Sequence, residues 1–420
     1  MTNENIVKNK PKSRIATADL PIPVWEFVAM VAALMALNAF AIDIMLPAMG
    51  VIGEHYSLSN PNDQQWILYS YLFGYGAPQL IFGPISDRYG RRNLLLFCIA
   101  AYAVFAMLCM ATTSFMMLLC VRFLQGVFAS GVRVIATSIV RDLTVGRAMA
   151  SIMSLVMTIF MIVPILAPAI GQGVMVVSSW QWTFGVLGVA AILLFIWVLI
   201  RLPETLKVEQ QRPLSFVNIR QGFQLVLGNR ITLGYMAASG VIFGALFSFI
   251  ASSEQIFDDV FGVGDRFALW FAIIASVLAI GNYLNSRVVE RYGMRRISHG
   301  VLFLFIILSS INFLAMTFIG EKLFIFIPLF ALTFGCFGML GANFSALAME
   351  PQGEVAGTAS AVYGFATSTV ASGFGFLVSS QFNGSVSPVI MGFIGLGVLS
   401  LMVVAFTEKG KLFELGEGKT

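Results

Sequence analysis

The chain has 420 residues, of which 58% are hydrophobic and only 11% are charged. Soluble domains carry about 25% charged residues, so this chain has too little polar surface to cover a particle in water, and lipid is its expected solvent. The formal net charge of +4 is too small to indicate a nucleic-acid partner.

Apolar segments long enough to cross a membrane follow one another along the whole chain. A transmembrane helix needs about 20 mostly apolar residues, and only helices or closed barrels satisfy their backbone groups in hydrocarbon. Continuous apolar runs, rather than strict alternation, favour helices. The sequence therefore predicts twelve spans, at 27–50, 65–85, 93–112, 116–139, 149–172, 182–201, 231–251, 267–286, 298–318, 323–347, 356–379 and 388–406.

Basic residues are distributed unevenly between the two ends of these spans. If the N-terminus is cytoplasmic, 21 of the 25 Lys and Arg residues fall on the cytoplasmic side. The external loops then hold only Arg266 and Lys322. This split follows the positive-inside rule, so we expect both termini to be cytoplasmic.

The chain also contains an internal repeat. The loop after span two reads D-R-Y-G-R-R (87–92), and the loop after span eight reads E-R-Y-G-M-R-R (290–296), about 203 residues later. Two parallel six-helix repeats are typical of transporters that rock around a central cavity. The predicted parts are a cytoplasmic tail (1–26), a six-helix bundle (27–201), a cytoplasmic linker (202–230), a second six-helix bundle (231–406) and a cytoplasmic tail (407–420).

The most specific motif is the segment G-P-I-S-D-R-Y-G-R-R at residues 83–92, which we call the gate loop. A carboxylate with several cations in a short loop can lock helix ends together by charge-assisted hydrogen bonds, and Gly83 and Gly90 permit a tight backbone. The motif resembles the signature G-x-x-x-D-R-x-G-R-R/K of the major facilitator superfamily. By that resemblance, Asp87, Arg88, Arg91 and Arg92 form a latch between helix ends.

Further motifs resemble one branch of that superfamily, the Bcr/CflA drug:proton antiporters of bacterial inner membranes. The resemblance implies an all-α integral membrane protein of the bacterial cytoplasmic (inner) membrane. Its twelve transmembrane helices would form two six-helix pseudo-repeats, the major facilitator fold. The matching segments are I-D-I-M-L-P-A (42–48), R-F-L-Q-G (122–126), V-R-D-L (140–143), P-I-L-A-P-A-I-G (164–171) and A-G-T-A-S (356–360).

Asp43 is the only acid well inside a predicted span. An unpaired carboxylate is costly in lipid, so Asp43 is expected to face the protein interior and to have a partner. Low dielectric favours the neutral form and a nearby cation favours the charged form, so a group balanced between them can take up and release a proton. We predict that Asp43 carries the coupled proton, as the resemblance to related exporters also implies. The alternative is a fixed ion pair that only braces span one against span four.

Arg122 is the expected partner of Asp43, because it matches the arginine of the superfamily's span-four motif. Gln125, one turn away, is a possible hydrogen-bond donor in the substrate cavity. Arg133 lies eleven residues beyond Arg122, which returns it to nearly the same helix face roughly 16 Å along the axis. It could bind an anionic substrate group there. Alternatively, it could snorkel toward the cytoplasm or pair with Asp142.

Pro164 and Pro168 lie in span five, where they remove backbone donors and are expected to bend the helix. In antiporters of the superfamily the equivalent motif is linked to exchange rather than uptake. Gly171 fits this motif, whereas Gln172 stands where a second glycine is common. A plain kink is the alternative interpretation.

The C-terminal half has no clear intramembrane charge, so the predicted chemistry belongs to the N-terminal half. The C-terminal half would contribute an apolar cavity wall, for which the candidates are Phe243, Phe247, Phe334 and Phe337. For any one of them, ordinary packing is the alternative.

These features predict a proton-coupled antiporter that exports small molecules, namely drugs or related amphipathic or zwitterionic compounds, by alternating access. One alternative is a dedicated exporter of an anionic metabolite such as a carboxylate siderophore, which Arg133 supports. Another is a proton-coupled uptake symporter, which shares Asp43 and the gate loop.

Other classes of function find little support in the sequence. His55 and His299 are the only histidines, and there is no H-E-x-x-H cluster and no phosphate-binding glycine loop before a lysine. We therefore expect a secondary active transporter and not an enzyme, with no cofactor, no metal site and no direct ATP coupling. A channel is a further alternative, but the duplicated loops favour alternating access. The expected partners are a small-molecule substrate, protons and the lipid bilayer, with no nucleic acid, and the protein is expected to be monomeric.

Overall fold

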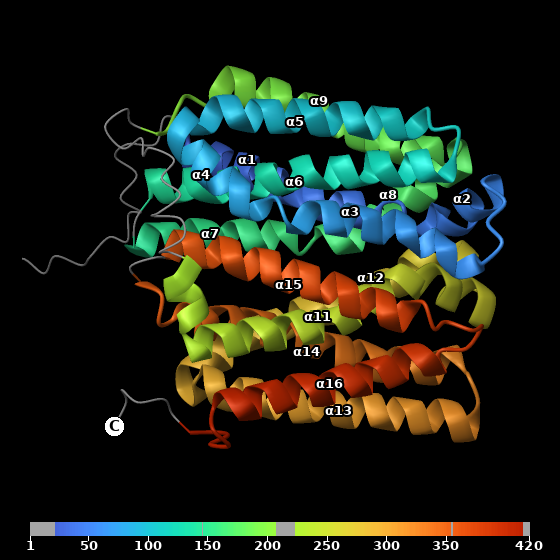
Figure 1. Ribbon diagram of the computed structural model, residues 1–420. Coiled ribbons are helices and arrows are strands. Elements are labelled where there is room, and N and C mark those ends of the chain that lie inside the picture. Colours follow the sequence, from blue (N-terminus) through green and yellow to red (C-terminus); the bar gives the residue numbers. More distant parts are fainter. Residues whose placement is uncertain (1–21, 145, 207–222, 354–355, 415–420) are drawn as a thin grey trace, which may run out of the picture.

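The computed structural model describes residues 22–144, 146–206, 223–353 and 356–414. Most of the predicted N-terminal tail, most of the predicted linker and the last residues of the chain lie outside these ranges. Within them the chain forms long helices that lie side by side (Figure 1).

The N-terminal half of the bundle carries the blue-to-green helices of Figure 1. Its elements are α1 (Val24–Asp43), η1 (Leu46–Ala48), α2 (Met49–His55), η2 (Pro61–Gln65), α3 (Trp66–Gly76), α4 (Gln79–Tyr89), α5 (Arg91–Met110), α6 (Phe115–Leu143), α7 (Gly146–Phe160), α8 (Val163–Val177) and α9 (Gln181–Arg201).

The C-terminal half carries the yellow-to-red helices and packs beside the first half (Figure 1). Its elements are α11 (Arg230–Gln255), η4 (Ile256–Val260), η5 (Gly264–Arg266), α12 (Phe267–Tyr292), α13 (Met294–Ile319), α14 (Leu323–Met349), α15 (Ala356–Ser379) and α16 (Ser387–Thr407).

The described helices confirm an all-α membrane protein. Eleven helical segments are long and apolar enough to cross a bilayer. The remaining predicted span, the second, is made by α3 and α4 in succession, each only 11 residues long. Together these segments make the twelve crossings of two six-helix pseudo-repeats.

Prolines interrupt three of the N-terminal spans. Pro47, Pro78 and Pro164 lack the N–H that would bond to the carbonyl four residues earlier. The preceding helices end at Asp43, Gly76 and Phe160, respectively. A continuous helix over 65–85 was therefore the wrong prediction, whereas the break at residues 161–162 lies where the span-five prolines were expected to bend the chain.

Helix crossings built on glycine recur in both halves. A Cβ atom at Gly126 of α6 would overlap the carbonyl oxygen of Tyr71 in α3. In the second half, a Cβ at Gly338 of α14 would overlap the carbonyl oxygen of Leu278 in α12. Small residues let membrane helices approach this closely. The same kind of glycine contact in both halves supports the internal duplication.

The turns that follow the second span of each half are also alike. Gly90 (φ 94°, ψ 158°) ends α4 and begins α5, and Gly293 (φ 80°, ψ 151°) ends α12 and begins α13. Positive φ favours glycine at both turns. We call the end of the bundle that carries Gly90 and Gly293 the basic end, because Arg91, Arg92 and two more arginines (Arg295 and Arg296) follow them. The other end is called the opposite end.

Gly171, predicted as part of the span-five motif, allows α8 to contact the interrupted first span. A Cβ at Gly171 would overlap the carbonyl oxygen of Ile44, just after α1. Gly173, on the same helix, has no neighbouring atom within 4 Å of its Cβ position. The two glycines therefore form a matched pair that differs in packing.

We expect Gly171→Ala to lower the free energy of unfolding by about 1–3 kcal/mol, because overpacking pushes α8 away from α1. Gly173→Ala should be neutral or stabilising by up to about 1 kcal/mol, since alanine has the higher helix propensity. Thermal unfolding of the purified variants measures the difference. Equal stability of the two variants would contradict the close approach at Ile44.

Candidate functional site

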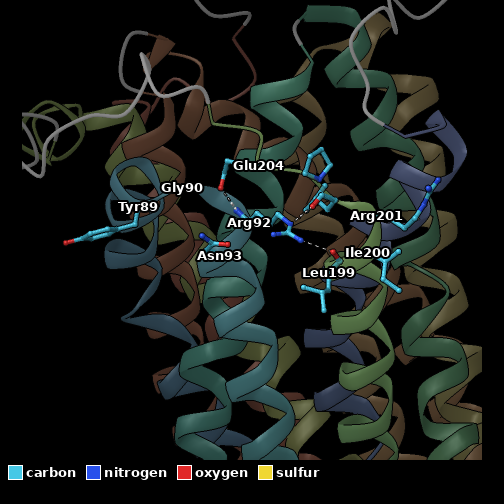
Figure 2. Close-up of a pocket in the computed structure, with 10 residues that line it drawn as sticks. Tyr89, Gly90, Arg92, Asn93, Leu199, Ile200, Arg201 and Glu204 are labelled. Atoms are coloured by element: carbon cyan, nitrogen blue, oxygen red, sulfur yellow. Dashed lines mark hydrogen bonds between the residues drawn. The ribbon is translucent and has the colours of Figure 1, made fainter.

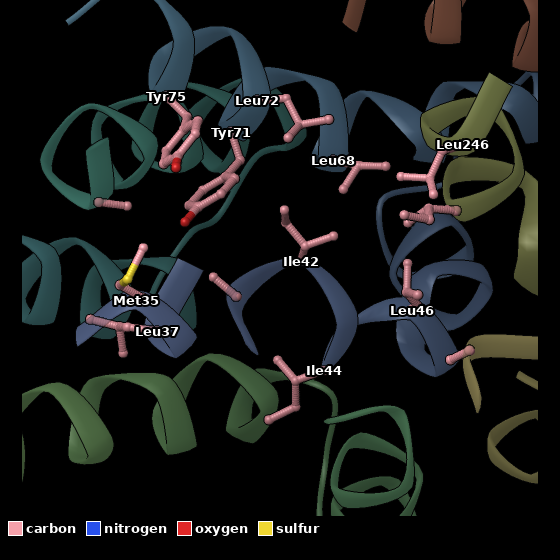
Figure 3. Packing of buried hydrophobic residues seen from close by; sticks show 14 of the residues in the cluster. Met35, Leu37, Ile42, Ile44, Leu46, Leu68, Tyr71, Leu72, Tyr75 and Leu246 are labelled. Atoms are coloured by element: carbon pink, nitrogen blue, oxygen red, sulfur yellow. The ribbon is translucent and has the colours of Figure 1, made fainter. Parts of the chain in front are cut away.

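Asp43 lies at the point where the first span is interrupted. It is the last residue of α1, and its backbone carbonyl has no N–H partner at Pro47. Its side chain is only 4% exposed. Ile42 and Ile44, on either side, pack into the surrounding apolar core (Figure 3). Asp43 is therefore inside the protein, beside a break in a membrane helix.

Arg122 is completely buried on α6 and joins several helices. Its Nη1 donates to Gln125 Oε1 (2.7 Å), its Nη2 donates to the Ala41 carbonyl (3.2 Å), and its Nε donates to the Ile67 carbonyl (3.3 Å). The guanidinium also lies 4.5 Å from the ring centre of Tyr71. Carbonyl, amide and π-electron contacts thus stabilise this cation.

The predicted ion pair between Asp43 and Arg122 is not formed. Within the described ranges, no ion pair or hydrogen bond involves the Asp43 side chain. Near Asp43, the Nη2 of Arg122 instead donates to the sulfur of Met45, at 3.0 Å. Met45, two residues after Asp43, thus contacts Arg122 in place of the carboxylate.

Gln125 is also fully buried, and its role differs from the predicted one. Its amide oxygen accepts a hydrogen bond from Arg122, and among the described residues its amide nitrogen has no partner. It therefore helps to hold Arg122 inside the N-terminal half.

Two of the four predicted cavity phenylalanines lie in the core of the C-terminal half. Phe334 and Phe337 are 3% and 2% exposed, and their rings contact Phe249 and Phe305, respectively. The prediction that they line a cavity is wrong for this structure, because this face of α14 packs against α11 and α13.

Phe243 and Phe247, both on α11, are only half-buried. The ring of Phe243 stacks on that of Phe337 at 6.1 Å, and the carbonyl of Phe247 accepts a bond from Tyr69 of the other half. Phe247 therefore lies where the two halves meet.

The gate loop joins the ends of four helices of the N-terminal half. Arg91 is 2% exposed and pairs with Asp87 (2.6 Å) and Asp142 (2.8 Å). Glu204, just after α9, accepts bonds from the backbone N–H groups of Arg91 (2.9 Å) and Arg92 (3.1 Å). These bonds make a latch between α4, α5, α6 and the end of α9.

Arg92 completes this latch beside a hollow of about 650 Å³ between α5 and α9 (Figure 2). Its side chain donates to the carbonyls of Leu199 (2.8 Å) and Leu202 (2.6 Å). The hollow opens at the basic end, away from Asp43, so we assign it to the latch and not to the substrate path.

Two gate-loop residues differ from the others. Gly83 is inside α4, and its Cβ position has only Val134 nearby, at 4.0 Å, so the prediction that the backbone there is tight enough to need glycine is wrong. Arg88 is exposed, and within the described ranges no side-chain bond involves it.

Polar side chains close the opposite end between the two halves. Gln65 Nε2 donates to Gln255 Oε1 (2.8 Å) and to the Ser379 carbonyl (3.1 Å). Gln64 Nε2 donates to Glu254 Oε2 (2.9 Å). We call these residues the seal.

Gln172 makes a further contact between the halves at the opposite end. Its amide nitrogen donates to the carbonyls of Gly264 (3.1 Å) and Asp265 (2.6 Å), and its amide oxygen accepts from the Ala268 N–H (3.1 Å). Gln172, which stands where the motif commonly has a glycine, therefore joins α8 to the start of α12.

Sequence reasoning missed the seal, Glu204 and an ion pair of the buried Glu26 with the exposed Arg201. Glu26 of α1 accepts two bonds of 2.7 Å from Arg201 of α9, one residue outside the predicted first span. Glu204 could have been found from the repeat, because Glu408 follows the last span 204 residues later and pairs with Arg295 (2.9 Å). The seal residues lie at span ends, where polar side chains are ordinary.

Comparison with known proteins agrees with the helical membrane fold described above. The sequence profile of the Major Facilitator Superfamily matches residues 31–376. A bicyclomycin resistance protein homolog of Haemophilus influenzae is 28% identical and covers 93% of this chain and 98% of its own. An uncharacterized MFS-type transporter of Bacillus subtilis, YdgK, is 31% identical over 84% of this chain and 86% of its own.

A further relative and a solved structure extend the comparison. The multidrug resistance protein MdtL of Escherichia coli is 26% identical over 90% of this chain and 95% of its own. Among solved structures, the xylose transporter XylE of E. coli, in a partially occluded inward-open conformation, superposes with a TM-score of 0.72 at 13% identity. That match covers 94% of this chain and 99% of that one, and at this identity it shows the fold alone.

We predict that Arg91→Gln lowers the free energy of unfolding by about 3 kcal/mol, because it removes the cation from two carboxylates in a buried network. Arg88→Gln, in the same loop but exposed, should change it by less than about 0.5 kcal/mol. Thermal unfolding in detergent compares the two variants. A similar effect of both substitutions would show that the latch does not stabilise the fold.

Proposed function

The chain belongs to the Major Facilitator Superfamily, and from this premise we propose that it is a proton-coupled antiporter that exports small molecules by alternating access. The proposed cargo comprises drugs or related amphipathic or zwitterionic compounds. Two of the relatives, which are named for resistance to bicyclomycin and for multidrug resistance, support export as the direction.

The single observation that carries the proposal is the environment of Asp43. The carboxyl group is buried in a membrane helix and has no cation and no hydrogen-bond donor among the described residues. An ionised carboxylate in such a site is costly, so the geometry favours the protonated acid. The acid can ionise when water or a cargo group reaches it. Exposure to one side of the membrane at a time then couples proton movement to cargo movement.

Interrupted helices support this assignment. Ligand and ion sites of transporters typically lie where membrane helices are discontinuous, because freed backbone groups face the cavity. Asp43 is at such an interruption, and the α7–α8 break in span five is another. Both belong to the N-terminal half, in which we place the proton site.

The contacts between the halves support alternating access. At the opposite end the seal joins them, and toward the basic end Leu80 of α4 packs against the cluster of Met236 and Val362. Because the two sets lie at different ends of the bundle, one set can separate while the other holds. We propose that the basic end is cytoplasmic, as are both termini, that the membrane is the bacterial inner membrane, and that the protein acts as a monomer.

Asp43→Asn keeps the size of the side chain but cannot exchange a proton. In everted vesicles tested with a panel of drugs and organic acids, we expect it to reduce pH-gradient-driven accumulation to the level seen after the gradient is collapsed. Because the wild-type acid is favoured in its neutral form, the unfolding free energy should change by less than about 1 kcal/mol.

Glu54→Gln is the matched control, because Glu54 is an exposed acid later in the same span. It should leave gradient-driven accumulation unchanged. Continued uphill accumulation by Asp43→Asn would remove Asp43 from the coupling mechanism. Uptake in place of export would instead favour the symporter.

A second candidate, a dedicated exporter of an anionic metabolite, is favoured by one observation: the surroundings of Arg133.

A further inference from the structure

Arg133 lies where the two halves meet, between the seal and the basic end. It is half-buried on α6, ten residues before the last residue of that helix, Leu143. Its Nη1 is 3.4 Å from Gln79 Oε1 of α4 and 3.7 Å from the Cβ position of Gly364 on α15. The guanidinium thus reaches across the interface to the backbone of the second half.

The acids that could neutralise Arg133 are already engaged. Asp142 on the same helix, the predicted alternative partner, pairs with Arg91, and so does Asp87 of α4. Within the described ranges, no ion pair involves Arg133.

The second half offers no partner at this depth either. The helices α14 and α15 contain no acid, and the one acid of α11, Glu254, belongs to the seal at the opposite end. Arg133 is therefore a cation inside the bundle without a carboxylate from the described chain.

Neutral polar groups of both halves lie next to Gln79 and Gly364, the neighbours of this cation. Gln79 is 2% exposed, and its amide nitrogen is 3.4 Å from Ser368 Oγ on α15. Next to Gly364, the hydroxyl of Tyr363 bonds to Ser239 of α11 (2.7 Å). These groups can reorient to donate hydrogen bonds, because hydroxyl and amide groups carry both donors and acceptors.

We propose that Arg133, together with Gln79 and the hydroxyl groups of Ser368 and Tyr363, forms an anion subsite that binds a carboxylate of the transported molecule. The proposal rests on the proposed transport function and narrows its cargo to organic anions and zwitterions. A guanidinium presents a planar pair of donors that fits a carboxylate. Its present bond to Gln79, at 3.4 Å, is long and easily exchanged for such a ligand.

The position of the subsite would also link cargo to the movement of the halves. Arg133 and Gln79 belong to the first half, whereas Ser368 and Tyr363 belong to the second. A carboxylate bound between these side chains would draw the two halves together at the subsite. Cargo binding would then favour closure at the basic end.

The test uses two compounds of matched size, 1-naphthaleneacetate and its uncharged amide, 1-naphthaleneacetamide. Binding of each radiolabelled compound is measured on the purified full-length protein in nanodiscs. We expect the wild type to bind the acid more tightly and Arg133→Gln to lose about 10- to 100-fold in acid affinity, as for a charged hydrogen bond. Amide affinity should change little.

Two variants separate this effect from others. Arg133→Lys keeps the charge but not the planar donor pair, so it should retain part of the preference. Arg287→Gln removes an exposed arginine on α12 and should leave the preference unchanged. Equal loss of acid and amide binding in Arg133→Gln, or no preference for the acid in the wild type, would overturn the subsite.

The outcome is independent of the proton-coupling proposal. If Asp43→Asn retains uphill transport while Arg133→Gln loses the preference for the acid, the coupling mechanism fails and the subsite stands. If Asp43→Asn abolishes coupling while Arg133→Gln keeps the preference, the reverse holds.

Discussion

A charge inside a membrane protein has to be compensated by the protein itself, because lipid offers no hydrogen bonds and little dielectric screening. In this chain most of the interior charges meet that requirement. Arg91 has two carboxylates, Glu26 has Arg201, and Arg122 has carbonyls, an amide and aromatic rings. In the part of the chain that the structure describes, the side chain of Asp43 has no hydrogen-bond or ion-pair partner, and the guanidinium of Arg133 has a single long bond, to Gln79.

The two groups have different chemistry, and each suits one of the two proposed sites, the proton site or the cargo site. A carboxyl group can become neutral by taking a proton, whereas an arginine stays charged and needs an anion. Asp43 lies beside an interrupted helix inside the first half, and Arg133 lies at the surface where the halves meet. The proposed proton site and the proposed cargo site are thus separate, and the relative movement of the halves is what would connect them.

The architecture was largely predictable from local signals. The lengths of the apolar runs indicated the spans, and the repeated G-R-R and G-M-R-R segments indicated the duplication, which the turns at Gly90 and Gly293 confirm. The resemblance of the gate loop also implied that Asp87 and Arg91 form part of a latch, and they pair across the turn at Gly90 that separates α4 from α5.

The site was less predictable, because it depends on helix rotation and on contacts between distant segments. The spacing of residues 43 and 122 could not show that Arg122 bonds to the Ala41 carbonyl and to Met45 and not to Asp43. An inward-facing phenylalanine such as Phe337 looks the same in a sequence whether it packs against a helix or lines a cavity. Gln65 and Gln172 are polar residues at span ends, and only the folded chain shows that they join the two halves.

The most direct test of the central claim is to count the protons that leave the purified protein when cargo binds. A compound that the vesicle panel identifies as transported is added at saturating concentration to wild type and to Asp43→Asn in weakly buffered detergent solution, and a pH indicator records the release. If Asp43 holds the coupled proton, the wild type releases protons and Asp43→Asn, which still binds the compound, releases none. Equal release by the two proteins would contradict the account.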